Sequence, residues 1–269
     1  MKIIAHKNKL IKLIKKEKNL GFVPTMGCMH AGHLSLVKKS IKQCTKTIVS
    51  IFVNKPQFNR KSDFQKYPRV FNKDKSMLKK LKVDFLFYPT EKQIYPCGPN
   101  KNIKINSFSK KLCGKNRPGH FESVADVVDR FIKIIKPKKI YFGEKDMQQL
   151  KILEHFIKKN HPYTKIISCK TVREKNGIAY SSRNNLLTVD QKIIASKIFK
   201  LLIKEKKKLI KNKLFIRKIK SMIYKLGVKK IDYIEVLNIN SLVKPYKKKK
   251  EYRIFIAYYL QTTRLIDNI

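Results

Sequence analysis

The first two-thirds of the chain alternate short apolar segments with longer stretches in which apolar residues recur at helical spacing. The short segments are rich in β-branched and aromatic residues, as buried parallel strands are, and the expected strands cover residues 21–25, 47–54, 83–89, 138–144 and 164–172. The helices expected between them lie near 32–44, 72–82, 122–136 and 146–160. This alternation predicts a parallel α/β sheet with right-handed crossovers and with ligands at the carboxyl ends of its strands.

The pattern changes after about residue 184. A long helical region rich in Lys, Leu and Ile is expected over 189–227, with Gly227 as its stop, and strands are expected at 231–238 and 252–260. The segment 244–252 is expected to form the turn between those strands. We therefore predict two domains, an α/β domain over residues 1–180 and a small α+β domain over residues 181–269.

The charge balance is strongly basic. The 269 residues include 64 Lys and Arg against 18 Asp and Glu, which gives a formal net charge of +46. One interpretation is a nucleic-acid-binding protein, because clustered cations displace counterions from a phosphate backbone. The lysines are spread over both ends of the chain and most expected helices, which favours a solvated background and no specific nucleic-acid partner. A basic surface would also raise the local concentration of anionic small molecules, so it is compatible with an enzyme that acts on anions.

The five cysteines show no CxxC spacing, so neither a disulfide framework nor a zinc ribbon is indicated, and a reducing compartment fits best. The N-terminal segment has no long apolar core, and no stretch approaches the ~20 apolar residues of a membrane helix. We expect a cytoplasmic protein without a membrane partner. The cysteines are Cys28, Cys44, Cys97, Cys113 and Cys169.

The segment PTMGCMHAGHLSL places a glycine-containing turn between an expected strand and an expected helix. His30 and His33 lie three apart, so the first helical turn can present both imidazoles on one face. The unpaired N–H groups of a helix N-terminus favour an anion, and Gly32 allows a ligand to approach the backbone closely. A phosphate site is one hypothesis. A metal-binding pair and two incidental histidines are the alternatives, the former lacking a third ligand nearby.

Three further segments carry candidate chemistry. Gln57 follows the expected strand 47–54 and can form two amide contacts with a hydroxyl or a carboxylate. Lys145 follows the expected strand 138–144 and can meet a phosphate as a point charge, with Gln149 about one turn further on. Arg183 in AYSSRNN can bind a phosphate in a forked geometry. The turn LCGKNRPGHF contributes Arg117, Gly119 and His120 ahead of a helix, and its chemistry is open.

The order of these segments resembles the pantothenate synthetase family, the pantoate–β-alanine ligases. PTMGxxHxGH, SIFVNxxQF, YPR, RPGHF, YFGEKDxQQL, TVRExxGxAxSSRN and TRLIDN follow one another from about residue 20 to the C-terminus. The resemblance implies a Rossmann-like nucleotidyl-transferase domain, a small C-terminal lid domain and a homodimer. It also implies a two-step reaction, in which ATP activates pantoate as an acyl-adenylate that β-alanine then attacks, with pyrophosphate and AMP as products.

The resemblance also assigns residues, position by position. His33 stands at the family's proton donor, with His30 and Lys145 as further catalytic groups, and Gln57 and Gln149 stand at the pantoate site. Asp74 stands at an acidic position associated with Mg²⁺, with a contact that water would mediate. The ATP-binding positions are Met26, Gly27, Cys28, Met29, His30, Ala31, Gly32, His33, Gly143, Glu144, Lys145, Asp146, Val172, Tyr180, Ser181, Ser182 and Arg183.

The chain departs from the family pattern at three places. Ala31 replaces the usual acidic residue between the histidines, Lys55 and Pro56 alter the approach to Gln57, and Tyr180 stands where Met is common. These changes bear on rate and affinity rather than on reaction type. A different adenylyl- or cytidylyl-transferase on the same fold remains an alternative, although the paired glutamines and the TRLIDN terminus argue against it.

Overall fold

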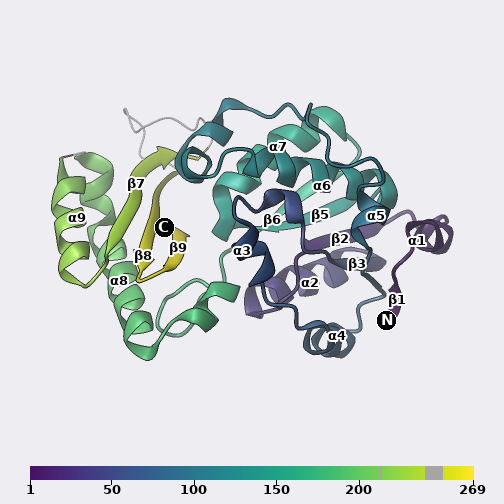
Figure 1. Cartoon of the computed structure of the whole chain (residues 1–269), viewed down its shortest axis with the longest axis horizontal. Helices are drawn as coiled ribbons and strands as arrows, with labels where there is room; N and C mark the ends of the chain where they lie inside the picture. Colours follow the sequence, from purple (N-terminus) through teal and green to yellow (C-terminus); the bar gives the residue numbers. More distant parts are fainter. Residues whose placement is uncertain (213, 240–250) are drawn as a thin grey trace. The chain divides into compact units, whose positions relative to one another are not determined.

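The computed structural model describes residues 1–212, 214–239 and 251–269, and it divides into two compact units (Figure 1). Unit 1 comprises Met1–Glu144 and Gln148–Lys170, and unit 2 comprises Lys145–Met147 and Thr171–Ile269. This division falls after Lys170, whereas the sequence pattern placed the domain boundary after residue 180. Residues 244–250 of the turn expected at 244–252 lie outside the described residues.

Unit 1 is built on a six-stranded, fully parallel sheet in the order β1-β4-β3-β2-β5-β6 (Figure 1). Its strands are β1 (Lys2–Ile4), β2 (Leu20–Thr25), β3 (Lys46–Ile51), β4 (Phe85–Phe87), β5 (Lys139–Gly143) and β6 (Lys165–Cys169). The five expected strands are confirmed, and β1 is an addition. Since β1 has only three residues, it is too short to leave a periodic signal.

The expected crossover helices of unit 1 are confirmed and are joined by shorter ones. The helices are α1 (Lys7–Ile14), α2 (Ala31–Gln43), α3 (Lys61–Gln65), α4 (Phe71–Lys80), α5 (Glu91–Ile94), α6 (His120–Ile135) and α7 (Met147–Asn160). Single 3₁₀ turns lie at η1 (Lys55–Gln57), η2 (Ser107–Lys110), η3 (Leu112–Asn116) and η4 (Glu144–Asp146). Strand β3 stops at Ile51 and not at Asn54, because the chain turns into η1, where Pro56 has no N–H to continue a ladder.

Helix α2 packs closely on the strands that precede and follow it. A Cβ atom at Gly21 in β2 would lie 2.1 Å from Oγ of Ser40, so only glycine fits beneath the helix there. Ser40 in turn forms a 2.9 Å hydrogen bond with Thr47 of β3. These contacts fix the axis of α2, and with it the direction in which the first turn of this helix points.

In its described residues, unit 2 combines two helices with a three-stranded antiparallel sheet, β7-β8-β9. The helices are α8 (Val189–Lys211) and α9 (Phe215–Lys225), the strands are β7 (Lys230–Asn238), β8 (Tyr252–Leu260) and β9 (Thr263–Asn268), and η5 is Ser182–Leu186. Both expected strands are confirmed, whereas the terminal segment forms β9, an element for which the sequence pattern gave no prediction. The predicted fold class, a parallel α/β domain with a small α+β domain, is confirmed.

The helical region expected over 189–227 is two helices and not one. Thr188 and Gln191 form a capping box that starts α8, and Asn212 ends this helix in an extended conformation. The predicted stop at Gly227 is confirmed, because this residue has φ +97° and its N–H donates to the carbonyl of Tyr224.

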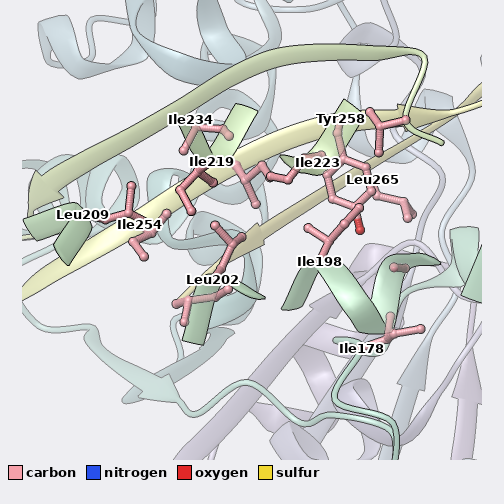
Figure 2. Packing of buried hydrophobic residues seen from close by; sticks show 14 of the residues in the cluster. Ile178, Ile198, Leu202, Leu209, Ile219, Ile223, Ile234, Ile254, Tyr258 and Leu265 are labelled. Carbon is pink, nitrogen blue, oxygen red and sulfur yellow. The ribbon is translucent and has the colours of Figure 1, made fainter. Parts of the chain in front are cut away.

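The core of unit 2 lies between its helices and its sheet (Figure 2). Ile198 and Leu202 of α8 and Ile219 and Ile223 of α9 pack in one cluster with Ile254 of β8. Among the described residues, none of the helices combines the length and the apolar composition needed to cross a bilayer.

Candidate nucleotide and substrate sites

The turn between β2 and α2 carries the first group of predicted ATP-binding residues. Gly27 has φ +80° and Cys28 has φ 53°, so the chain reverses in the left-handed region. The hydroxyl of Thr25 accepts a hydrogen bond from the N–H of Gly27 at 3.1 Å and donates to the carbonyl of Ser50 at 2.6 Å. The turn is therefore tied to the ends of both β2 and β3.

Asp74 of α4 holds the same turn from a position far along the chain. Its two carboxylate oxygens accept hydrogen bonds from the N–H groups of Cys28 at 2.8 Å and Met29 at 2.7 Å. The residue is only 1% exposed, so these charge-assisted bonds are shielded from water. Burial raises the pKa of the Cys28 thiol, and the negative charge of Asp74 adds to this effect. The positive charge of Lys73 opposes it but is the smallest of the three contributions. The buried environment of Cys28 therefore favours the neutral thiol over the thiolate.

The position of Asp74 bears on the predicted Mg²⁺ contact. Magnesium takes oxygen ligands in near-octahedral geometry and keeps several waters. Both oxygens of Asp74 already accept N–H groups, and the described residues contain no group of three or more His, Cys, Asp and Glu side chains able to hold a metal. These residues do not fit a resident magnesium ion that Asp74 would bind directly.

The two histidines of the HxGH segment lie together at the start of α2. His30 is the N-cap residue, and its ring stacks on that of His33 with centroids 4.0 Å apart. The first N–H groups of the helix have no partner within the helix and carry a partial positive charge. Two imidazoles and these N–H groups form a donor set suited to a phosphate.

Gln57 lies beside the turn between β2 and α2, although the two are separated in sequence. Its side-chain NH₂ donates to Sδ of Met26 at 3.0 Å, and its Oε1 accepts from Nδ2 of Asn54 at 3.1 Å. Its backbone carbonyl accepts from Arg117 at 3.2 Å and interacts with Nδ1 of His120 at 3.0 Å. The RPGH turn, whose chemistry the sequence left open, therefore positions Gln57.

Asn54 is a site residue that the sequence pattern had treated only as the end of a strand. It is 1% exposed and accepts a 2.7 Å hydrogen bond from the hydroxyl of Tyr95. Burial, followed by the charge of Asp126, raises the pKa of Tyr95, so this hydroxyl stays protonated and remains a donor. Its position at the carboxyl end of the expected strand 47–54, three residues before Gln57, is the signal that could have identified Asn54.

Gln149 and its neighbour Gln148 on α7 have different environments. Gln148 is buried and bridges a loop, accepting from the N–H of Cys113 at 3.0 Å and donating to the carbonyls of Phe108 and Lys111 at 2.9 and 2.7 Å. Gln149 is half-buried. The structure thus separates a loop-supporting glutamine from the one that the sequence assigned to pantoate.

A cavity of about 210 Å³ in unit 1 reaches part of the predicted site. Met26, Gly27 and Asp74 line it together with the ring of Phe64, while Gln57 is not among its lining residues. Four further predicted residues of this unit lie at the start of α2, namely its N-cap His30 and then Ala31, Gly32 and His33. Gly143 ends β5, and Glu144 opens η4.

In unit 2, Lys145, Ser181 and Arg183 line one cavity of about 20 Å³, which holds no more than a water molecule. The Nζ of Lys145 lies 3.3 Å from a carboxylate oxygen of Asp146. The carbonyl of Val172 accepts from the N–H of Tyr180 at 3.1 Å, which brings two further predicted residues into one hairpin. Ser182 opens η5. Unit 2 therefore gathers the predicted lysine, serine and arginine around one small space.

A parallel α/β sheet with two imidazoles at a helix N-terminus, and a second unit with a lysine–serine–arginine cluster, define an α/β enzyme of the nucleotide-binding class. The chain belongs to the pantoate–β-alanine ligase family, whose model matches residues 2–269.

Individual relatives agree with this assignment. The chain is 42% identical to a pantothenate synthetase of Sulfurihydrogenibium over 97% of its own length and 95% of that protein. It is 41% identical to one of Caldicellulosiruptor saccharolyticus over 97% and 94% of the two chains.

Solved structures of the family have the same fold. A pantothenate synthetase from Thermus thermophilus superposes with a TM-score of 0.93 at 29% identity, covering 100% of this chain and 99% of that one. A pantoate–β-alanine ligase from Francisella tularensis, solved with β,γ-ATP and β-alanine, superposes with a TM-score of 0.83 at 37% identity, covering 100% of this chain and 97% of that one.

Proposed function

We propose that this protein condenses pantoate with β-alanine in an ATP-dependent reaction that passes through pantoyl-adenylate. The observation that carries the proposal is the stacked pair of His30 and His33 at the N-terminus of α2, on a turn held by Asp74, in a chain that matches the ligase family over residues 2–269. The Francisella tularensis relative, which was solved with β,γ-ATP and β-alanine, supports both substrates.

In the first step, a carboxylate oxygen of pantoate attacks the α-phosphorus of ATP and pyrophosphate leaves. Gln57 and Gln149 hold pantoate through its hydroxyl and carboxylate groups. The imidazoles of His30 and His33 and the N–H groups of α2 stabilise the charge that develops on the α-phosphate, and His33 supplies the proton. Mg²⁺ enters with ATP as part of the substrate, and because both oxygens of Asp74 already accept N–H groups, a contact to this ion would run through water.

In the second step, the amine of β-alanine attacks the acyl carbon of pantoyl-adenylate, and AMP leaves with the bridging oxygen. No protein nucleophile takes part, so the work of the chain is positioning and charge stabilisation. We assign the β- and γ-phosphates to Lys145, Ser181, Ser182 and Arg183, whose charged and hydroxyl groups suit them. The other proposed ATP contacts are Met26 to Met29, Ala31, Gly32, Gly143, Glu144, Asp146, Val172 and Tyr180.

The proposal is tested by incubating the protein with ATP, Mg²⁺, pantoate and β-alanine and omitting each component in turn. The complete mixture gives stoichiometric AMP, pyrophosphate and pantothenate. Omission of β-alanine limits pyrophosphate release to about one equivalent per site, because the adenylate stays bound. Multiple turnovers of pyrophosphate without pantoate, or with nucleoside monophosphate acceptors, would assign the chain to another adenylyl- or cytidylyl-transferase.

We also propose a homodimer, on the basis of the family resemblance, and a cytoplasmic location, because five cysteines without CxxC spacing fit a reducing compartment. Sedimentation equilibrium tests the first, with about twice the 31.7 kDa chain mass expected. A monomer at micromolar concentration would contradict it.

A further inference from the structure

The C-terminal motif TRLIDN has no task in the proposed reaction. It forms β9 (Thr263–Asn268), the edge strand of the sheet in unit 2 that pairs with β8. The side chains of its last two residues are polar and largely buried. Asn268 is 3% exposed, and the side chain of Asp267 is 13% exposed. Buried polar side chains need hydrogen-bond partners, and the identity of these partners indicates what the motif does.

Asn268 contacts the backbone of Lys145. Its Nδ2 donates to the carbonyl oxygen of Lys145 at 2.8 Å, and its Oδ1 accepts from Nη1 of Arg253 at 2.7 Å. The guanidinium has only donors, so it requires the oxygen of the carboxamide on its own side. The NH₂ group must therefore face Lys145, and the orientation of the amide is determined by its two partners.

Asp267 holds Asn268 in place through Arg173. The Asp267 carboxylate binds Arg173 at 2.7 and 2.9 Å in a forked pair, and Nη2 of Arg173 also donates to the backbone carbonyl of Asn268 at 3.2 Å. The guanidinium stacks over the ring of Phe199 at 4.3 Å. Strand β9 therefore ends in a rigid polar cluster.

Lys145 needs such support because of the element that carries it. It lies in η4, one 3₁₀ turn between β5 and α7, and a single 3₁₀ turn has poor internal hydrogen-bond geometry. Its side chain is 18% exposed and lies within reach of the Asp146 carboxylate. A fixed carbonyl restricts the backbone from which the ammonium extends.

We propose that Asn268 is a positioning residue that fixes the main chain of Lys145, so that the ammonium group is aligned with the phosphates of ATP. This inference rests on the proposed role of Lys145. Asn268 itself does not touch the substrate, and its effect is transmitted through the Lys145 side chain. Substitution of Asn268 is therefore expected to change KM for ATP and not KM for β-alanine.

The test is the Asn268→Asp variant, which is nearly isosteric and keeps the acceptor for Arg253 but turns an oxygen toward the Lys145 carbonyl. We expect KM for ATP to rise about tenfold, as for the loss of one buried hydrogen bond, with KM for β-alanine unchanged. Ile234→Val creates a small cavity in the same sheet and serves as the control for a loss of stability. We expect this control variant to leave KM for ATP unchanged. If Asn268→Asp does not fold, Asn268→Ser removes the contact without adding charge and carries the same expectation.

A double-mutant cycle with Lys145→Ala separates the possible outcomes. On that background the Asn268 substitution has no further effect on KM for ATP, because the group it positions is gone. An equal effect in both backgrounds, or an equal rise for β-alanine, overturns the positioning role. If Lys145→Ala raises KM for ATP and Asn268→Asp does not, the positioning role of Asn268 is wrong, while the proposed role of Lys145 stands. If Lys145→Ala leaves KM for ATP unchanged, the proposed role of Lys145 fails and the inference fails with it.

Discussion

Replacing Asp74 by asparagine removes one of the two acceptors that hold the turn between β2 and α2. The N–H groups of Cys28 and Met29 point at different carboxylate oxygens, 2.8 and 2.7 Å away. Whichever way the new carboxamide is turned, its NH₂ group faces one of these N–H groups. The variant therefore loses one charge-assisted hydrogen bond and leaves a buried donor unsatisfied.

The magnitude follows from the burial of this contact. A hydrogen bond to a charged group contributes about 1.5–3 kcal/mol, and an unsatisfied buried donor costs about 1–3 kcal/mol, so the two overlapping effects together cost about 2–4 kcal/mol. At roughly 2–4 °C per kcal/mol for a chain of this size, Tm falls by about 4–16 °C. KM for ATP also rises, because the loosened turn carries His30 and the start of α2.

The assay is thermal unfolding followed by circular dichroism, together with the KM for ATP from pyrophosphate release. Asp63→Asn is the matched control, because it makes the same chemical change at an exposed carboxylate in α3 and shifts stability by no more than about 0.5 kcal/mol. A Tm for Asp74→Asn within about 1 °C of that control, with an unchanged KM for ATP, would refute the reasoning.

Three further predictions concern the reaction and the thiols. His33→Ala lowers pyrophosphate release by roughly 10²–10³-fold, whereas the exposed control His155→Ala does not, and near-normal turnover in the first variant would remove His33 from the mechanism. Gln149→Ala raises KM for pantoate more than KM for ATP, and equal rises would contradict the substrate assignment. Burial and the charge of Asp74 raise the pKa of the buried Cys28 thiol, which lowers its thiolate fraction at pH 8. We therefore expect iodoacetamide to modify the exposed Cys97 before Cys28, as measured by peptide mass spectrometry. Equal labelling of the two cysteines would contradict this prediction.

The elements that the sequence predicted are those with a strong apolar pattern. Strands β2 and β5 are short runs of mostly buried apolar residues, and helix α6 carries apolar residues at helical spacing, so both patterns are visible without tertiary information. Strand β9 was not predicted because the charged residues Arg264 and Asp267 interrupt its apolar pattern. In the fold these charges are paired with Asp232 and Arg173. Partners distant in sequence cannot be read from local patterns.

The same distinction applies to the site. Short motifs predicted His30, Gln57 and Lys145 as candidate site residues, because each lies in a turn that follows a strand. They did not reveal the residues that hold these groups, since Asp74 and Asn268 reach their partners only through the fold. The family resemblance links Asp74 to Mg²⁺ through water, and the fold adds a second role, because the Asp74 carboxylate holds the turn between β2 and α2.

The most direct test of the proposed reaction follows oxygen from pantoate labelled with ¹⁸O in both carboxylate positions. If the carboxylate attacks the α-phosphorus and β-alanine then displaces AMP, each AMP carries one ¹⁸O atom and each pantothenate amide keeps the other. Mass spectrometry of the two products measures both. Unlabelled AMP, with ¹⁸O in pyrophosphate or phosphate instead, would contradict an acyl-adenylate and with it the proposed function.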